Sequence, residues 1–300
     1  MLSVENVCHQ FGPKKVLYNV NLKIDAGEMV SFVGPSGCGK STLLKDILGT
    51  QFPTSGEITV DSKKVEGPNR NVGIVYQHYS LYDFLTAQEN VAFGLMLDQT
   101  SLFWPVNKSR FFNFFGWRKL RKTHLRQASE LLEKLGLGAA NNLYPNEMSG
   151  GMRQRVAIAQ ALIMKPKVLL LDEPFGALDE ATREELQKML LGFAQENLVA
   201  KKENKIPPHT IIMVTHELHE AIYVCDRVIG LSQYYIGGHN GATIIYDKPC
   251  PDFLSRKSED LNLINAQKQD LRNVVFSEEL VWPDEHVRPQ PTTALFCVLK

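Results

Sequence analysis

Residues 29–41, MVSFVGPSGCGKS, decide the fold of this chain. The apolar run 29–33 has the length of a buried strand, and the glycine-rich stretch after it fits the pattern G-x-x-x-x-G-K-[ST]. A helix is expected from about Lys40 to Leu48, and Gly49 is placed to end it. This order of strand, loop and helix predicts a phosphate-binding loop; a glycine-rich turn without a ligand is the weaker alternative.

Each residue type in this loop has a chemical reason. Glycines let the backbone curl so that successive N–H groups point at phosphate oxygens, and the helix N-terminus adds partial positive charge. Lys40 can reach the β- and γ-phosphates of a nucleotide, and Ser41 offers a hydroxyl to Mg²⁺. The expected nucleotide-binding residues of the loop are Gly34, Pro35, Ser36, Gly37, Cys38, Gly39, Lys40, Ser41 and Thr42.

The composition is that of an ordinary globular protein, with 44% hydrophobic and 22% charged residues. Lys and Arg (33) balance Asp and Glu (33), so the net charge gives no argument for a nucleic-acid partner. No window approaches the ~18 uncharged apolar residues of a spanning helix, and no secretory signal pattern opens the chain. Five scattered cysteines without a C-x-x-C pair fit a reducing cytosol. Any service to a membrane is therefore expected from its cytoplasmic face.

A second apolar strand, residues 168–171, ends in two carboxylates. Ligands of open α/β sheets bind beyond the carboxyl ends of the strands, which places Asp172 near the metal that Ser41 would hold. Glu173 is then placed to orient or deprotonate an attacking water. Taken alone, an Asp-Glu pair after a strand is more often a solvated loop, and only the phosphate-binding loop favours the catalytic interpretation.

Residues 148–155, MSGGMRQR, predict a second anion site. Ser149 is a good N-cap candidate for the helix that follows, expected over about 151–164. Gly150 and Gly151 expose backbone N–H groups at this second helix N-terminus. A capped helix start is structural more often than not, but here it occurs in a chain that already has one phosphate-binding loop.

These segments, in this order, resemble the ATP-binding subunits of ABC transporters over roughly residues 2–236. Residues 148–155 are similar to the ABC signature, and further positions match the family in sequence. The matching positions are Phe11 for the adenine-stacking aromatic, Gln77 for the Q-loop glutamine, Gly176, Ala177, Leu178 and Asp179 for the D-loop, and His216 for the switch histidine. By themselves, Gln77 would be interpreted as a loop amide and His216 as a packed or surface histidine.

The resemblance implies an α/β fold. Its P-loop NTPase (RecA-like) core would carry an antiparallel β portion near the N-terminus and an inserted helical subdomain. The expected ATPase domain covers residues 1–248, with the helical subdomain at about 80–151. An insert at about 101–122 lies within that subdomain, and residues 249–300 form a C-terminal extension.

The resemblance also implies MgATP hydrolysis by a dimer, in which two subunits pack head to tail. Each ATP would lie between one subunit's phosphate-binding loop and the other's signature residues Ser149, Gly150, Gly151 and Met152. Gln77 would sense metal and nucleotide, His216 would steady the γ-phosphate, and Asp179 would communicate across the dimer. The implied catalytic set is Lys40, Gln77, Glu173 and His216, and the implied Mg²⁺ set is Ser41, Gln77 and Asp172.

The sequence of residues 149–159 is SGGMRQRVAIA, with methionine where most relatives have glutamine. This sequence resembles the importer ATPases for nitrate, sulfonates and taurine. The implied partners are a second ATPase subunit, membrane-spanning permease subunits and an extracytoplasmic solute-binding protein. A soluble ABC protein that acts as a switch on nucleic acid or ribosomes is the rival, but this chain has one cassette, balanced charge and no sustained heptads. A P-loop small-molecule kinase would leave the second anion site unexplained.

Three further features have competing interpretations. The aromatic-basic segment, residues 101–122, contacts the membrane partner or lipid headgroups, or else forms a local hydrophobic cluster with a solvated basic rim. Cys38 has a pKa lowered by the adjacent helix N-terminus and undergoes nucleotide-protected alkylation, or it is a small filler. The tail after Pro249 regulates the ATPase or packs passively against it.

Overall fold

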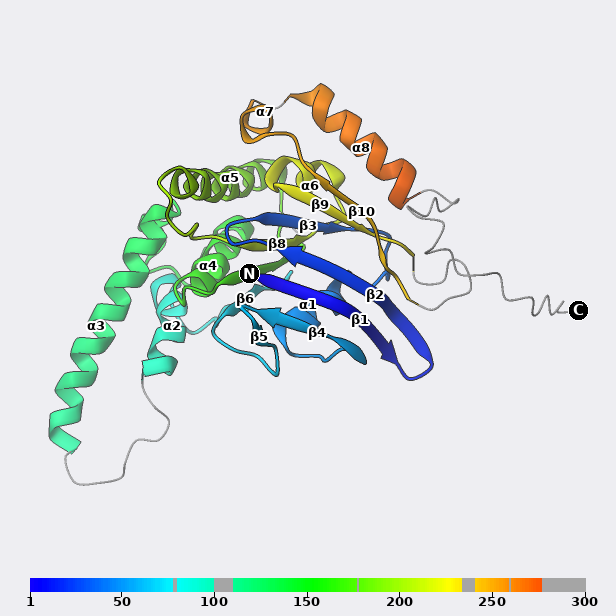
Figure 1. The fold of residues 1–300 in the computed structure, drawn as a ribbon. Coiled ribbons are helices and arrows are strands. Elements are labelled where there is room, and N and C mark those ends of the chain that lie inside the picture. Colours follow the sequence, from blue (N-terminus) through cyan, green and yellow to red (C-terminus); the bar gives the residue numbers. More distant parts are fainter. Residues whose placement is uncertain (78–79, 100–109, 177, 234–240, 259, 277–300) are drawn as a thin grey trace, which may run out of the picture. The chain divides into compact units, whose positions relative to one another are not determined.

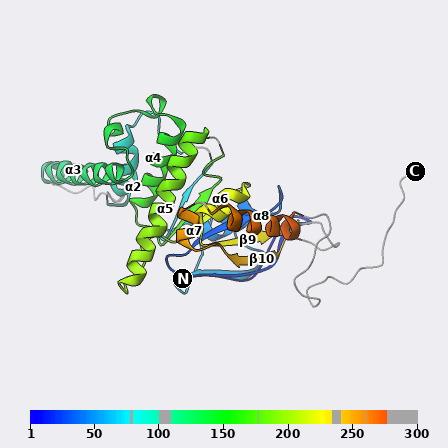
Figure 2. The ribbon, with the colours of Figure 1, turned by 90° about the horizontal axis from the view of Figure 1, so that it is seen from above.

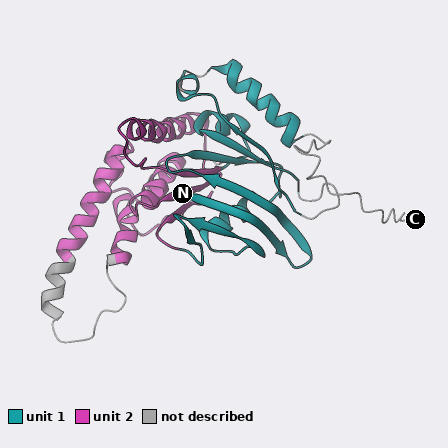
Figure 3. Ribbon diagram, in the orientation of Figure 1, with its two compact units in different colours: residues 1–68, 214–300 teal, residues 69–213 magenta. Residues whose placement is uncertain are grey.

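The computed structural model spans residues 1–300 and describes all of them except 78–79, 100–109, 177, 234–240, 259 and 277–300. The chain divides into two compact units, residues 1–68 with 214–300, and residues 69–213 (Figure 3). None of the helices in this described part combines the length and the apolar character that a membrane crossing requires.

The first unit begins with an antiparallel sheet of strand order β2-β1-β4-β5 (Figure 1). Its strands are β1 (Leu2–Phe11), β2 (Lys14–Ile24), β4 (Ser55–Val60) and β5 (Lys63–Lys64). The buried side chains of β1 change from even to odd positions between Val4 and Val7, because the register shifts there and Asn6 takes a positive φ of 50°. This sheet is the antiparallel portion predicted near the N-terminus.

The strand before the phosphate-binding loop, β3 (Met29–Val33), is buried along its whole length. It pairs in parallel with β9 (Arg227–Leu231), and β10 (Ile244–Pro249) is antiparallel to β9. The helix α1 (Lys40–Leu48) has the predicted bounds. It ends where Gly49 adopts a φ of 82° and its N–H donates to carbonyls of the last turn, a conformation in which a side chain would be strained.

Three further helices complete the first unit. The short helix α6 (Leu218–Val224) follows the predicted switch histidine, and the region beyond Pro249 forms α7 (Phe253–Lys257) and α8 (Leu261–Val275). Both α7 and α8 pack against α6, and α8 also packs against β9 and β10 (Figures 1 and 2). The apolar segment 294–299 lies outside the described residues.

The second unit contains strands of order β8-β7-β6, with bounds β6 (Val72–Val75), β7 (Val168–Asp172) and β8 (Ile211–Val214). The strands β6 and β7 are parallel, and the four leucine and valine residues of β7 are buried, as predicted for a strand covered on both faces.

Its helices are α2 (Ala87–Gln99), α3 (Arg110–Lys134), α4 (Gly150–Leu162) and α5 (Glu180–Lys202), with 3-10 turns η1 (Gly138–Ala140) and η2 (Pro145–Glu147). The helices α2, α3 and α4 pack against one another and form the helical part predicted within the α/β fold.

Candidate functional site

The phosphate-binding loop joins β3 to α1 and presents one exposed face. Gly34, Gly37 and Gly39 all have positive φ, and Cys38 N–H donates to Pro35 O at 3.2 Å to close the tight turn. A Cβ at Gly34 would lie 2.7 Å from the Leu231 carbonyl oxygen, whereas a Cβ at Gly37 would meet no atom within 4 Å. Glycine at Gly34 therefore permits close packing inside the unit, and Gly37 leaves its side of the loop open for a ligand.

The side chain of Lys40 lies inside this loop. Its Nζ donates to the carbonyl oxygens of Gly34 at 2.8 Å and Pro35 at 3.1 Å, and the residue is buried. Ser36, Gly37 and Ser41 are exposed, whereas Thr42 is half-buried. The loop therefore combines a pre-positioned ammonium group with accessible N–H and hydroxyl donors, which suits a polyphosphate.

The interpretation of Cys38 as a reactive thiolate is wrong. The residue is 1% exposed, and burial raises the pKa of its thiol although the neighbouring Lys40 charge acts to lower it. Lys40 Nζ lies 3.7 Å from the Cys38 sulfur, so the thiol packs beneath the loop. The local position near a helix N-terminus suggested an activated cysteine, but desolvation is the larger effect on the pKa.

The aromatic ring of Phe11 is about half exposed at the end of β1, and its centroid lies 4.5 Å from that of His9. His9 Nδ1 in turn lies 3.0 Å from both carboxylate oxygens of Asp46 in α1, and both side chains are buried. Burial raises the pKa of Asp46 to about 6, and the neighbouring His9 acts to lower it. Through His9, the predicted adenine-stacking residue is attached to the helix that follows the phosphate-binding loop.

The switch-histidine candidate, His216, is exposed directly after β8. The preceding residue is fixed from two sides: Thr215 N–H donates to Phe32 O at 3.4 Å, and Thr215 Oγ1 donates to Glu220 Oε2 at 2.8 Å. Both Thr215 and Glu220 are buried. Buried hydrogen bonds of this kind hold the His216 turn in one conformation.

In the second unit, Gln77 and Glu173 approach the same glycine. A Cβ at Gly176 would lie 3.5 Å from Gln77 Nε2 and 3.8 Å from Glu173 Oε2. Glu173 has a left-handed backbone with a φ of 49°, which costs free energy for a residue with a side chain and turns the chain sharply after Asp172. The predicted acidic pair and Q-loop glutamine are thus arranged around one turn at the end of β7.

The signature segment begins α4 as predicted. Ser149 Oγ accepts the Met152 N–H at 3.2 Å, which makes Ser149 the N-cap, and this serine is exposed. Gly151 is buried against α5: a Cβ there would lie only 1.7 Å from Thr182 Cγ2. Glycine is required at this position because the starts of two helices meet there.

Asp179 caps α5 through the same threonine. Its Oδ1 accepts the Thr182 N–H at 3.0 Å and its Oδ2 accepts the Thr182 hydroxyl at 2.8 Å, and these hydrogen bonds lower the pKa of Asp179. Since Thr182 also contacts Gly151, the D-loop and the signature helix are joined by one side chain. Ala177, the second residue of the predicted D-loop, lies outside the described residues.

Only part of the aromatic-basic segment can be placed. The aromatic residues Phe103, Trp104, Phe111, Phe112, Phe114, Phe115 and Trp117, together with Lys108 and Arg110, lie outside the described side chains. The basic residues farther along α3 border a hollow on the second unit. Its lining residues are Gln88, Arg118, Arg121, Lys122, Leu125, Arg126 and Ser129. The described lining is cationic and contains no carboxylate, although Arg121 pairs with Glu89 nearby at 2.8 Å.

The residues predicted to hold Mg²⁺ fit that ion by their chemistry. Among the described residues, no group of three or more His, Cys, Asp or Glu side chains could hold a metal ion by itself. Ser41, Gln77 and Asp172 instead offer oxygen ligands of the kind that Mg²⁺ takes when substrate phosphates and water complete its octahedron.

The family model described as "ABC transporter" matches residues 17–176, more than half of the chain. The chain belongs to this family. One relative of this chain is the sulfate/thiosulfate import ATP-binding protein CysA of Pseudomonas syringae pv. tomato. The two sequences are 38% identical over 268 residues, which cover 88% of this chain and 74% of the relative. The protein of the same name from Rhodopseudomonas palustris is 36% identical over 259 residues, covering 84% of this chain and 66% of that relative.

Solved ABC cassettes have the same fold. The dimeric ATP-binding cassette MJ0796, in a post-hydrolysis state bound to ADP and Pi, is 30% identical, with a TM-score of 0.62 over 84% of this chain and 100% of that one. The predicted fold class is therefore confirmed, and this ABC protein is an ATP-binding ATPase.

The sequence did not identify four residues that contact predicted site residues or the turns that carry them. They are His9, Asp46, Thr182 and Glu220. One signal was available: Asp46 lies three residues after the buried Leu43 in a nine-residue helix, so a carboxylate occurs on the apolar face. Thr182 and Glu220 carry no comparable signal, because both occupy ordinary polar positions near the start of a helix.

Proposed function

We propose that the chain is the ATP-hydrolysing subunit of an ABC importer for a small anionic solute. The resemblance of residues 149–159 to nitrate, sulfonate and taurine importers supports an anionic solute. The relatives named for sulfate and thiosulfate import support the same class of solute. The observation that carries the proposal is that one chain contains both a phosphate-binding loop around Lys40 and a second, exposed helix start capped by Ser149.

Two separate anion sites in one chain are explained by a dimer. A nucleotide on the phosphate-binding loop of one subunit would be covered by Ser149, Gly150, Gly151 and Met152 of the other. The related cassette MJ0796 is dimeric in its solved structures, which supports this arrangement. Asp179 and Thr182 would link the covered nucleotide to the rest of the second unit, because Thr182 contacts both Asp179 and Gly151.

In the proposed reaction, Lys40 and the loop N–H groups bind the β- and γ-phosphates, and Phe11 stacks on the adenine. Mg²⁺, held by Ser41, Gln77 and Asp172, would neutralise phosphate charge. Glu173 orients or deprotonates water, and its strained backbone directs the carboxylate toward the turn that also positions Gln77. His216 donates to the γ-phosphate from its fixed turn.

The proposed partners are a second ATPase subunit, membrane-spanning permease subunits and an extracytoplasmic solute-binding protein, with this chain at the cytoplasmic face of the membrane. The cationic hollow that contains Arg118, Lys122 and Arg126 is a surface for contact with the permease or with lipid headgroups. The hollow lies in the helical part, and four cationic side chains line it together. This clustering favours contact with an anionic or membrane-bound partner over the alternative of basic side chains that are merely solvated.

The test is the oligomeric state of Glu173→Gln with and without MgATP, measured by light scattering after size-exclusion chromatography. We expect a monomer that becomes a dimer with MgATP, since nucleotide binds and hydrolysis no longer reopens the pair. Glu66→Gln, at an exposed position, is the matched control and should hydrolyse ATP normally. A Glu173→Gln protein with near-normal turnover would refute the role of Glu173, and one that binds ATP as a monomer would refute a dimer formed by this chain alone.

A further inference from the structure

The C-terminal extension is packed closely against the unit that carries the phosphate-binding loop. In α8 the side chains Ile264, Leu271 and Val275 are buried. Val275 fills the space in front of Gly230 in β9, where a Cβ would lie 2.4 Å from Val275 Cγ2. At the exposed edge, Lys248 Nζ pairs with Asp270 at 2.7 Å. The described part of the extension is therefore an integral layer of this unit.

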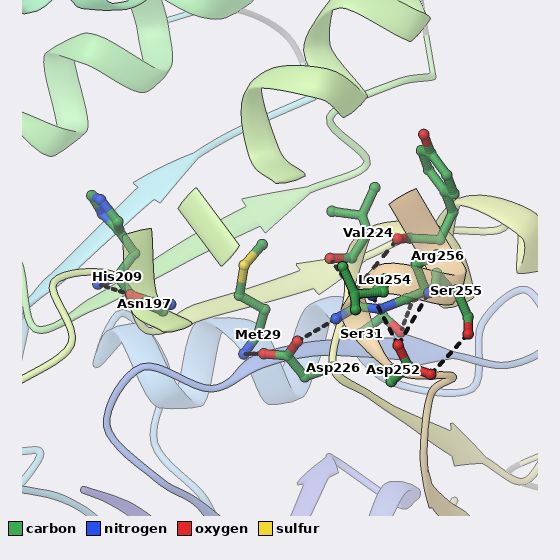
Figure 4. Close-up of polar contacts among 12 residues, drawn as sticks. Met29, Ser31, Asn197, His209, Val224, Asp226, Asp252, Leu254, Ser255 and Arg256 are labelled. Carbon is green, nitrogen blue, oxygen red and sulfur yellow. Dashed lines mark hydrogen bonds and ion pairs between the residues drawn. The ribbon is translucent and has the colours of Figure 1, made fainter. Parts of the chain in front are cut away.

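One residue of the extension, Arg256 in α7, reaches α6. Arg256 is 2% exposed, and its Nη1 donates to the carbonyl oxygens of Val224 at 2.9 Å and Tyr223 at 3.5 Å (Figure 4). Its Nη2 donates to Asp226 Oδ1. The last carbonyls of a helix lack partners within the helix and carry partial negative charge, which a buried cation stabilises. Arg256 thus caps the C-terminus of α6 from another element.

The ion-pair partner, Asp226, connects this cap to β3. Its Oδ2 accepts the Met29 N–H at 3.1 Å, and its own N–H donates to Met29 O at 2.6 Å (Figure 4). A second link lies one turn back, where Ser31 Oγ donates to Ala221 O at 3.4 Å. Because β3 leads directly into Gly34, the position of α6 is fixed against the strand that carries the phosphate-binding loop.

The other end of α6 carries the His216 turn. Glu217 N–H donates to Thr215 Oγ1 at 3.1 Å, and the same hydroxyl donates to Glu220 in the first turn of the helix. The helix has only 7 residues, so its two ends are less than two turns apart. A displacement of the C-terminus of α6 is therefore transmitted to the turn at its start.

We propose that Arg256 is a positioning residue for the ATPase reaction. By holding the end of α6 against β3, it fixes the turn from which His216 reaches the nucleotide. The inference rests on the role proposed above for His216. It also gives the C-terminal extension a part in catalysis, where the sequence left regulation and passive packing open.

The experiment compares steady-state ATP hydrolysis by the full chain, its Arg256→Gln and Arg256→Lys variants, and the control Lys248→Met. The control removes an ion pair of the same extension that does not touch α6. For Arg256→Gln we expect kcat to fall roughly 10-fold while the dissociation constant for ATP changes less than about twofold, because the loop around Lys40 is untouched. The kcat of Arg256→Lys, which keeps the positive charge but loses the planar guanidinium group, should lie between those of the wild type and Arg256→Gln. The control should behave as the wild type.

A double-mutant cycle with His216→Ala separates positioning from general loss of structure. If Arg256 acts through His216, then Arg256→Gln has no further effect on kcat in the His216→Ala background. An equal loss in both backgrounds overturns the inference, and so does a kcat of Arg256→Gln that matches Lys248→Met. Should Arg256→Gln fail to fold, the same cycle is carried out with Arg256→Lys.

The cycle also distinguishes this inference from the proposed function. If His216→Ala hydrolyses ATP at the wild-type rate, the proposed role of His216 is wrong and the inference is refuted with it. If His216→Ala is impaired but Arg256→Gln either has a normal kcat or lowers kcat equally in both backgrounds, the inference alone is refuted and the proposed function stands.

Discussion

Replacing Gly151 with alanine tests the contact between the signature helix and the helix that follows the D-loop. The added Cβ would lie 1.7 Å from Thr182 Cγ2, so the starts of α4 and α5 must move apart by roughly 2 Å before the two carbon atoms reach an ordinary contact distance. Thr182 cannot simply rotate away, because its hydroxyl and its N–H are both bound to Asp179. The substitution therefore strains the signature, the D-loop or both.

The expected magnitude follows from two opposing effects. Overpacking of this kind costs about 1–3 kcal/mol of unfolding free energy. Replacing a helical glycine with alanine returns about 0.5–1 kcal/mol, so we expect a net loss of roughly 0–2.5 kcal/mol for Gly151→Ala and a loss of about 1–3 kcal/mol relative to an unhindered Gly→Ala substitution in a helix. Thr182→Ser removes the clashing methyl group but keeps the hydroxyl, and the next atom, Thr182 Cβ, would lie 3.1 Å from the new Cβ. The double variant should recover most of the loss.

Urea denaturation of the wild type, both single variants and the double variant measures this coupling. The matched control is Gly192→Ala in α5, where a Cβ would meet nothing within 4 Å. That control should be neutral or slightly stabilising. If Gly151→Ala is tolerated as well as Gly192→Ala, or if Thr182→Ser does not rescue it, the close approach of the two helices is refuted.

Two further predictions concern the first unit. Burial raises the pKa of Asp46 from its ordinary value to about 6, so the folded protein binds this proton more tightly than the unfolded chain does. The contribution of the protonated carboxyl group to folding stability is therefore complete below about pH 4 and is lost as the pH rises through 6. The stability of the wild type relative to Asp46→Asn should thus fall by up to about 3 kcal/mol between pH 4 and 7, and parallel stability curves of the two proteins would contradict this. Because burial raises the pKa of the Cys38 thiol, maleimide at pH 7 should modify the less buried Cys8 first and should modify Cys38 slowly, with or without MgATP. Peptide mass spectrometry measures the labelling of each cysteine. Rapid labelling of Cys38 that MgATP prevents would contradict the prediction.

The sequence predicted those features that depend on local pattern. The phosphate-binding loop, the bounds of α1, the Ser149 cap and the family all follow from short segments whose residue types have one strong interpretation. The contacts between His9 and Asp46, 37 positions apart, and between Arg256 and Asp226, 30 positions apart, do not. A pairing of this kind is set by how separate elements pack, and no periodicity within either element reports it.

Cys38 shows how a local rule fails for the same reason. Proximity to a helix N-terminus and to Lys40 lowers the pKa of a thiol, and both are visible in the sequence. The burial that raises the pKa is a property of the folded chain, in which Cys38 is 1% exposed. The direction of the pKa shift therefore depends on tertiary packing, which a local sequence rule does not report.

Three departures from ordinary local rules occur in segments that carry proposed site residues or pack beneath them. A carboxylate is buried in α1, a glutamate adopts a left-handed backbone after β7, and a glycine is enclosed at the start of α4. Each costs stability, and each is maintained by specific partners: His9 for Asp46, the turn to Gly176 for Glu173, and Thr182 for Gly151. Strain of this kind is expected at functional sites, because such positions are not optimised for stability alone. The same reasoning applies to Arg256. A buried cation at the end of a seven-residue helix costs desolvation free energy, and its partners are the last carbonyls of α6 and Asp226, which binds the first residue of β3.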